Sequence, residues 1–191
     1  YKGYWPGVHV VGKDILRFHA VYWPAFLMAA GLEPPKQIVA HGWWTNEGEK
    51  ISKSLGNVID PIELINVYGL DQVRYFLMRE VPFGNDGDFS KEAMINRING
   101  DLSNNFGNLM QRVLSFIFKN SNQTIDFTDK VLNFNIYHNI ISSQINLYEM
   151  IERYSFDGYL KIIFGYLNDL NTYVDKSAPW DLRKTDQEKM K

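Results

Sequence analysis

The sequence predicts an α/β segment followed by an all-helical segment, with the change of class near residues 83–90. Two short β-branched runs flank a helical pattern in the first third, which is the strand–helix–strand order of a parallel sheet. From Ser90 onward, apolar residues recur every three or four positions, as in packed amphipathic helices. The stretch between these patterns is rich in Gly, Asn and Asp, which favour turns. We therefore expect a first part (1–60), a connecting segment (61–89) and a helical part (90–191).

The first part opens with a predicted buried strand at residues 9–11. A helical pattern covers residues 15–30, where Pro24 is expected to cause a kink and Gly31 to end the helix. A second strand is predicted at residues 37–41. Because parallel strands gather ligands at their carboxyl ends, the residues that follow the two strands are expected to share one rim.

Local turn and cap signals predict the structure that follows. A hairpin is expected over residues 43–51, turning at its Asn-Glu-Gly sequence, and an aperiodic loop over residues 50–57. Asp60-Pro61-Ile62-Glu63 is typical of a helix start, with a capping side chain, Pro at the first position and Glu at the third. Gly69 would end that helix, and Asp71 would cap the next one.

Four helices are predicted in the helical part. The first is long and amphipathic, with apolar residues at Ile95, Ile98, Leu102, Phe106, Leu109, Val113 and Phe116. Apolar spacing marks a second helix within residues 140–151 and a third within residues 156–174. Ala178-Pro179-Trp180 opens the fourth. Residues 120–133 are polar and are expected to connect the first two helices.

Composition limits the classes of function. Hydrophobic residues make up 45% of the 191 residues and charged residues 22%, as in ordinary folded proteins. No apolar run reaches the ~18 residues of a membrane span. The absence of cysteine excludes disulfides and thiolate zinc sites in this sequence, and it agrees with a reducing cytoplasm. The net charge of −2 means that any RNA binding must come from a local surface.

The most informative stretch is Lys50-Ile51-Ser52-Lys53-Ser54, called here the 50–54 loop. Two ammonium groups three residues apart, interleaved with hydroxyls, suit a polyphosphate whose negative charge grows as a leaving group departs. The alternative is a solvated basic loop without a ligand. Nothing in the stretch resembles the glycine-rich Walker loop.

Gly12-Lys13-Asp14 follows the first predicted strand. Asp14 either hydrogen-bonds a ribose hydroxyl or an amine, or it caps the helix that follows. His19 lies one helical turn after Ile15, so the two side chains face the same way. His19 is either a ligand-binding residue or a hydrogen-bonded core residue.

The helical part also holds candidate binding residues. Asn108 and Arg112 are four positions apart on one helical face, where they could contact base edges or simply be solvated. Trp180 either stacks on an unpaired base or packs into the core of the helical bundle.

Taken in order, these pieces resemble the class I aminoacyl-tRNA synthetases, and among them the methionyl-tRNA synthetase family. The 50–54 loop is similar to the lysine–serine signature of the class, with Ile in place of the usual Met. The run from His9 to His19, Tyr22-Trp23-Pro24-Ala25 and His41-Gly42 resemble the methionyl members. The resemblance covers almost the whole chain. It implies the second half of a Rossmann-type nucleotide fold, followed by a helical-bundle anticodon-binding domain that is truncated at its C-terminus.

This resemblance implies a cytoplasmic ligase that uses ATP and Mg²⁺ to convert methionine to methionyl-adenylate, and then esterifies the terminal adenosine of the methionine-accepting tRNA. By position, Lys53 would stabilise the triphosphate in the transition state with assistance from Lys50. The Ser52–Ser54 backbone would lie near the adenine, and Ile51 would be a further ATP-binding residue.

The resemblance also assigns the binding residues. Gly12 and Asp14 would lie beside the adenosine ribose, and Ile15, Phe18 and His19 would line the methionine pocket. Asn108 and Arg112, on the first long helix, would contact anticodon bases. Trp180 would stack on one of these bases. No metal-binding residues are predicted in this sequence.

Some family features are absent from these 191 residues: the His-Ile-Gly-His type motif that binds ATP, and the inserted connective domain that sometimes holds zinc. We therefore expect these residues alone not to activate methionine. Two alternatives stay open, a class I synthetase for leucine, isoleucine or valine and a non-catalytic tRNA-binding module. The amino-acid dependence of ATP–pyrophosphate exchange separates the first from a methionine enzyme.

Overall fold

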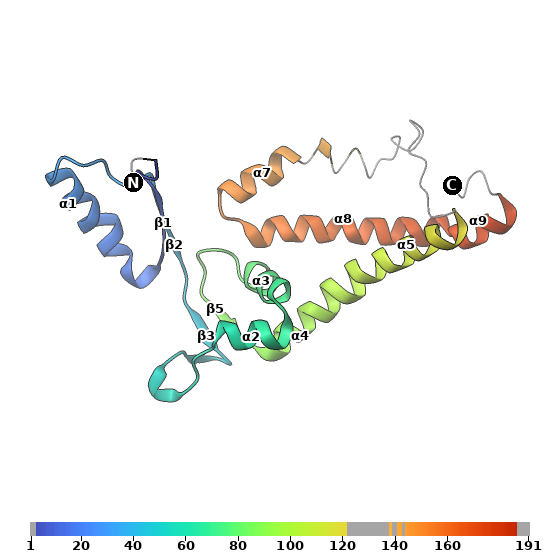
Figure 1. The fold of residues 1–191 in the computed structure, drawn as a ribbon, viewed down its shortest axis with the longest axis horizontal. Coiled ribbons are helices and arrows are strands. Elements are labelled where there is room, and N and C mark those ends of the chain that lie inside the picture. The colour runs from blue at the N-terminus through green and yellow to red at the C-terminus, as the bar shows by residue number, and fades with distance from the viewer. Residues whose placement is uncertain (1–2, 122–137, 139–140, 143, 187–191) are drawn as a thin grey trace.

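The computed structural model describes residues 3–121, 138, 141–142 and 144–186. The molecule is elongated, with a two-stranded sheet and α1 at one end and the tips of the long helices at the other (Figure 1). Short helices and a small sheet lie between these ends. No helix among the described residues is both long and apolar enough to cross a membrane.

The first end of the molecule contains the two predicted strands. Strand β1 (Val8–Gly12) pairs in parallel with β2 (Gln37–His41), and Gly12 lies opposite His41 at the carboxyl ends. Helix α1 (Trp23–Ala29) lies between the strands in the sequence. The buried side chains of this unit are Val11, Leu27 and Val39. The predicted parallel pairing and the shared rim are therefore confirmed.

The helix predicted over residues 15–30 is irregular. A π-helical stretch, η2 (Phe18–Tyr22), precedes α1, and the N–H of Trp23 bonds to the carbonyl of Phe18 five residues back. Pro24 stands in the first turn of α1. Because proline has no N–H to donate, the four-residue bonding pattern cannot run through it. The expected kink takes the form of a widened turn.

A three-stranded sheet follows. Strands β3 (Trp44–Asn46) and β4 (Glu49–Lys50) form the predicted hairpin, whose two turn residues both have positive φ. Strand β5 (Gly87–Phe89) adds to β3 in parallel, giving the order β4-β3-β5. Only turns were predicted in this stretch, so β5 is a correction. Its pairing partner lies more than forty residues away and supplies the order that the local sequence does not.

Helices α2 (Pro61–Tyr68) and α3 (Leu70–Arg79) are separated by the single residue Gly69. The Asp60 carboxylate accepts the N–H of Ile62 at 2.7 Å, as the cap signal predicted. The prediction that Asp71 caps α3 was wrong. Gly69 ends α2 and also occupies the cap position of α3, so Asp71 falls within the first turn.

The main core lies in the middle of the molecule. Phe76 of α3 and Met94 of α4 are completely buried, and Val73 and Phe89 complete the cluster. The rings of Phe76 and Phe89 meet edge to face at 5.8 Å, and Trp44 of β3 lies 6.1 Å from Phe76. This core therefore joins the three-stranded sheet to α3, which precedes β5 in the chain, and to α4, which follows it.

The helical part begins with one continuous helix made of α4, a π-helical stretch and α5. Helix α8 is the longest straight element, and α9 follows it after a left-handed residue at Ala178. The bounds are α4 Lys91–Arg97, η4 Ile98–Gly107, α5 Asn108–Asn120, α7 Gln144–Glu152, α8 Phe156–Ser177 and α9 Pro179–Thr185. The predicted polar connection at residues 120–133 lies outside the described residues beyond Ser121, as do Ile140 and the side chain of Ile145.

Candidate functional site

The ends of β1 and β2 form the first candidate surface. Gly12 occupies the cap position of a short 3-10 turn, η1 (Lys13–Ile15), and Asp14 lies inside that turn with an exposed side chain. The helix-cap interpretation of Asp14 is therefore wrong. A Cβ atom on Gly12 would lie 2.7 Å from Asp14 Oδ1, so glycine leaves room for the carboxylate at the rim; the His41 ring, at 3.7 Å, would be in ordinary contact.

The three residues expected to line an amino-acid pocket lie on the helical segment after this turn. His19 Nδ1 is 3.0 Å from the Ile15 carbonyl oxygen, which agrees with the predicted one-turn spacing. The His19 ring meets the ring of His9 on β1 edge to face at 6.2 Å. Ile15 and Phe18 are 40% and 59% exposed. This face is open, and His19 is half-buried rather than a core residue.

The 50–54 loop continues from the hairpin. It contains a single 3-10 turn, η3 (Lys53–Leu55), where the sequence analysis expected an irregular loop. Ser52 Oγ accepts the N–H of Ser54 at 3.2 Å, which caps this turn. Lys50 and Lys53 are exposed, and within the described part of the chain no carboxylate pairs with either ammonium group. Both charges are therefore available to an anionic ligand.

Asn57 closes the 50–54 loop, a role that the sequence analysis missed. Its side chain accepts the N–H of Ser52 at 2.8 Å and donates to the carbonyl of Lys50 at 3.0 Å. Its own carbonyl accepts from the side chain of Asn46 at 2.8 Å. Asn57 thus links the first half of the loop, Lys50 and Ser52, to Asn46 beside the hairpin turn. The signal was the Gly56-Asn57 pair, which follows the loop after Leu55, because Asn side chains commonly bond nearby backbone.

Asp86 is the second residue that the sequence analysis missed. Both of its carboxylate oxygens lie 2.6 Å from Lys13 Nζ, and Oδ1 also accepts the N–H of Trp43 at 2.9 Å. The hydrogen bond from Lys13, followed by that from Trp43, lowers the pKa of Asp86. Because Lys13 and Asp86 are 73 positions apart, no local pattern could have paired them.

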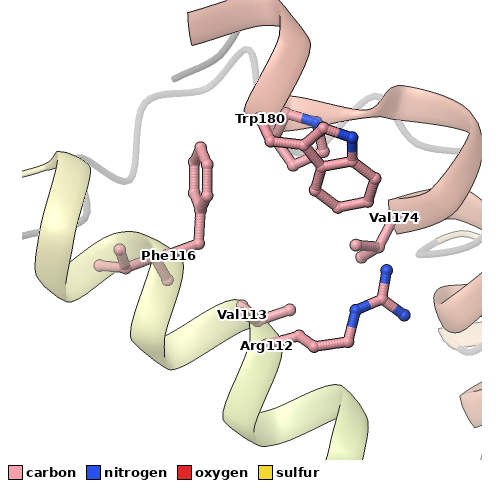
Figure 2. A pocket seen from close by; sticks show the side chains of 7 residues that line it. Arg112, Val113, Phe116, Val174 and Trp180 are labelled. Carbon is pink, nitrogen blue, oxygen red and sulfur yellow. The ribbon is translucent and has the colours of Figure 1, made fainter.

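A second candidate surface lies far along the molecule, where α5, α8 and α9 meet. Figure 2 shows a pocket between these helices, with Arg112 of α5 and Trp180 of α9 on facing walls. The guanidinium carbon lies 5.6 Å from the Trp180 ring centroid. Among the described residues, the lining apart from Arg112 is apolar: Val113, Phe116, Ile117, Val174, Pro179 and Trp180.

The state of the individual residues decides between the earlier alternatives. Trp180 is 42% exposed, so the core-residue interpretation is wrong. Arg112 forms an ion pair with Asp175 of α8. Asn108 is exposed at the start of α5, one turn before Arg112, and is not part of the pocket lining. The structure therefore brings Arg112 and Trp180 together and leaves Asn108 beside them on the surface.

A lysine–serine loop carried by a hairpin, which follows a parallel strand pair in the chain and precedes a helical part, is the arrangement of a class I aminoacyl-tRNA synthetase segment. The family model of the tRNA synthetases class I (M) matches residues 1–114. The chain therefore belongs to the methionyl-tRNA synthetase family of the class I enzymes.

Curated relatives extend the similarity to the whole chain. It is 52% identical to a methionine–tRNA ligase of Rickettsia bellii, over 100% of this chain and 38% of the relative. It is 48% identical to one of Mesorhizobium japonicum, over 98% of this chain and 37% of the relative. Among solved structures, Mycobacterium tuberculosis methionyl-tRNA synthetase in complex with methionyl-adenylate aligns with a TM-score of 0.84 and 44% identity, over 99% of this chain and 38% of that one. The chain thus spans about two fifths of the length of these relatives.

Proposed function

We propose that this chain is part of an enzyme that attaches methionine to its tRNA through methionyl-adenylate. The observation that carries the proposal is the pair of exposed, unpaired lysines in the 50–54 loop, in a chain about half identical to methionine–tRNA ligases along its whole length. Unpaired ammonium groups on a fixed loop can stabilise charge that develops on a phosphate.

The proposed chemistry begins with ATP and methionine. The methionine carboxylate attacks the α-phosphorus of ATP, the bond to the β-phosphate oxygen breaks, and pyrophosphate leaves with the bonding electrons. Lys53 stabilises the charge on the triphosphate in the transition state, and Lys50 assists. The Ser52–Ser54 backbone lies beside the adenine, and Ile51 is a further ATP-binding residue. The turn capped by Ser52 supports the role of Lys53, because it fixes the backbone from which the Lys53 side chain extends.

The β1–β2 rim would bind the rest of the two substrates. We assign Gly12 and Asp14 to the ribose, supported by the exposed carboxylate of Asp14 at the strand end. Ile15, Phe18 and His19 would line an apolar slot for the methionine thioether. Such a slot discriminates by about 1–3 kcal/mol per methylene-sized change.

The division of the chain into functional parts is also a proposal. Residues 1–60 would belong to a Rossmann-type catalytic domain, residues 61–89 would form connecting helices, and residues 90–191 would be an anticodon-binding helical bundle. Arg112 and Trp180 would recognise anticodon bases together with Asn108. The facing arrangement of the guanidinium and the indole across an apolar pocket supports this assignment.

We propose that Mg²⁺ enters as part of the ATP complex and that the enzyme works in the cytoplasm, as expected of a tRNA ligase. The described residues include no group of three or more His, Cys, Asp or Glu side chains that could hold a metal ion. Magnesium commonly keeps several waters and binds through substrate phosphates, so such a cage is not needed.

The test is methionine-dependent ATP–pyrophosphate exchange in a protein of the relatives' full length that contains these 191 residues at their aligned positions. We expect exchange with methionine and none with leucine or isoleucine. Lys53→Ala should lower kcat by about 10²–10³-fold, because it removes a charge that acts on the transition state. The control is Lys91→Ala, which changes an exposed lysine at the start of α4.

An unchanged rate in Lys53→Ala would refute the catalytic role. Absence of exchange with retained binding of a CAU stem-loop would favour a non-catalytic tRNA-binding module.

A further inference from the structure

Lys13, between Gly12 and Asp14, forms an ion pair with the side chain of Asp86. Lys13 Nζ lies 2.6 Å from each carboxylate oxygen of Asp86 and 4.2 Å above the centroid of the Trp43 ring. A lysine ammonium group has three donors and no acceptor, and its charge is attracted to an aromatic face. Lys13 is therefore held by protein groups, in contrast to the unpaired Lys50 and Lys53.

Asp86 connects the ends of both strands of the parallel pair. It binds Lys13, which directly follows β1, and the N–H of Trp43, two residues after β2. The backbone beside it is equally close, because a Cβ atom on Gly42 would lie 2.0 Å from the carbonyl oxygen of Asn85. Only glycine permits this approach. The segment around Asp86 is thus fixed against the rim where the proposed ribose residues lie.

The same segment continues directly into the sheet that carries the 50–54 loop. The N–H of Gly87 donates to the carbonyl of Trp43 at 2.8 Å, and β5 then pairs with β3 along its whole length. Asp88 accepts the hydroxyl of Thr45 at 2.5 Å and the N–H of Gly48, in the hairpin turn, at 2.8 Å. An unbroken series of contacts therefore runs from Lys13 to the hairpin, and from the hairpin to the loop.

We propose that Lys13 and Asp86 are positioning residues that hold the 50–54 loop in register with the nucleotide-binding rim. The inference rests on the proposed function, because it concerns the rate of adenylate formation. Lys13 and Asp86 side chains are 37% and 55% exposed, and exposed ion pairs contribute little to stability. Their value lies in geometry, since a displacement of about 1 Å of a catalytic group can reduce a rate 10²-fold.

The experiment uses the full-length background defined above and measures kcat and KM for exchange. Lys13→Met and Asp86→Asn should each lower kcat about tenfold or more, with less than threefold change in the KM for methionine, because the chemistry loses alignment while the pocket is unchanged. Lys13→Arg, which can still bind the carboxylate, should stay within about threefold of the unmutated kcat. Lys13→Met/Asp86→Asn should be no slower than the slower single variant, because both changes break one contact.

Two controls separate the possible causes. Arg153→Met breaks an exposed ion pair with Glu149 on α7 and should leave kcat unchanged. Amide hydrogen exchange of Trp43 and Gly87 should accelerate in Lys13→Met and in Asp86→Asn, whether or not the protein catalyses exchange. Failure of the unmutated protein to show methionine-dependent exchange would refute the proposed function, and the hydrogen-exchange result would then decide whether the contact holds the hairpin.

Three results would overturn the inference. One is a kcat within twofold of the unmutated value in both single variants. Another is a loss in the double variant equal to the product of the single losses, which would mean that Lys13 and Asp86 act independently. The third is unchanged hydrogen exchange at Trp43 and Gly87, which would show that the ion pair does not hold the hairpin.

Discussion

The two candidate surfaces differ in how much of each is assembled. At the β1–β2 end, Ile15 and Phe18 lie on an open face, and in the 50–54 loop neither lysine ammonium group is paired with a carboxylate of the described residues. At the far end, Arg112 already faces Trp180 across a pocket and is ion-paired with Asp175. The first surface therefore consists of exposed side chains on an open face, whereas the second is a pocket between helices.

The difference follows from where the contacts of each surface originate. The described lining of the pocket comes from α5, α8 and α9, three helices that lie side by side within this chain. The β1–β2 unit has only two strands, and both have one unpaired edge among the described residues. A sheet of this size has little apolar surface to bury. We therefore expect binding of an anticodon stem-loop to be the property that these residues express on their own.

The largest expected effect concerns the central core that joins the two surfaces. Phe76 is fully buried against Phe89 and Trp44, so Phe76→Ala leaves a cavity between the hairpin sheet and α3. We expect a loss of about 3–5 kcal/mol in the free energy of unfolding. Urea denaturation followed by circular dichroism measures it. The two surfaces could then no longer be compared on one folded molecule, because the core that connects them would be destabilised.

A matched aromatic substitution sharpens this test. Phe26 of α1 is 68% exposed, so Phe26→Ala removes little buried surface. We expect a change within about 0.5 kcal/mol, as for ordinary surface substitutions. A loss in Phe26→Ala as large as that in Phe76→Ala would contradict the assignment of the core to the middle of the molecule.

The second prediction concerns the formed pocket. Trp180→Ala should weaken binding of a stem-loop bearing the methionine anticodon CAU by about 1–3 kcal/mol, because a stacking surface is lost. Titration of the 191-residue chain with labelled CAU and scrambled stem-loops, at one stated salt concentration, measures it. Tyr148→Ala, which removes a 76% exposed ring from α7, is the control. Equal affinity of the unmutated chain for the two stem-loops would show that the pocket does not read the anticodon.

The sequence predicted those features whose signals are local. The Asp60 cap, the Asn-Glu-Gly turn and the β1 and β2 strands each depend on residues within a few positions, and all four are present. The contacts that organise the two surfaces are different in kind. The pairing of β5 with β3, and the Lys13–Asp86 and Arg112–Asp175 ion pairs, join residues 43, 73 and 63 positions apart. A charged residue has many possible partners at such distances, and only the folded chain selects one.

The smallest expected change in stability concerns the contact between α3 and η4, which lies between the two surfaces. The Tyr75 hydroxyl donates to Asp101 at 2.7 Å, and Arg97 donates to the same carboxylate oxygen at 3.4 Å. Burial, followed by the hydrogen bond to Asp101, raises the pKa of Tyr75. Tyr75→Phe should cost about 1 kcal/mol at neutral pH, because it removes this hydrogen bond.

The pH dependence distinguishes this hydrogen bond from simple packing. A raised pKa means that the folded protein holds the phenol proton more tightly than the unfolded chain does. The contribution of Tyr75 is therefore complete below the unfolded pKa of about 10 and declines as the pH rises above it. Urea midpoints of the unmutated chain and Tyr75→Phe should differ most at neutral pH and converge at strongly alkaline pH. A difference that stays constant would mean that the hydroxyl contributes through its volume and not through the hydrogen bond to Asp101.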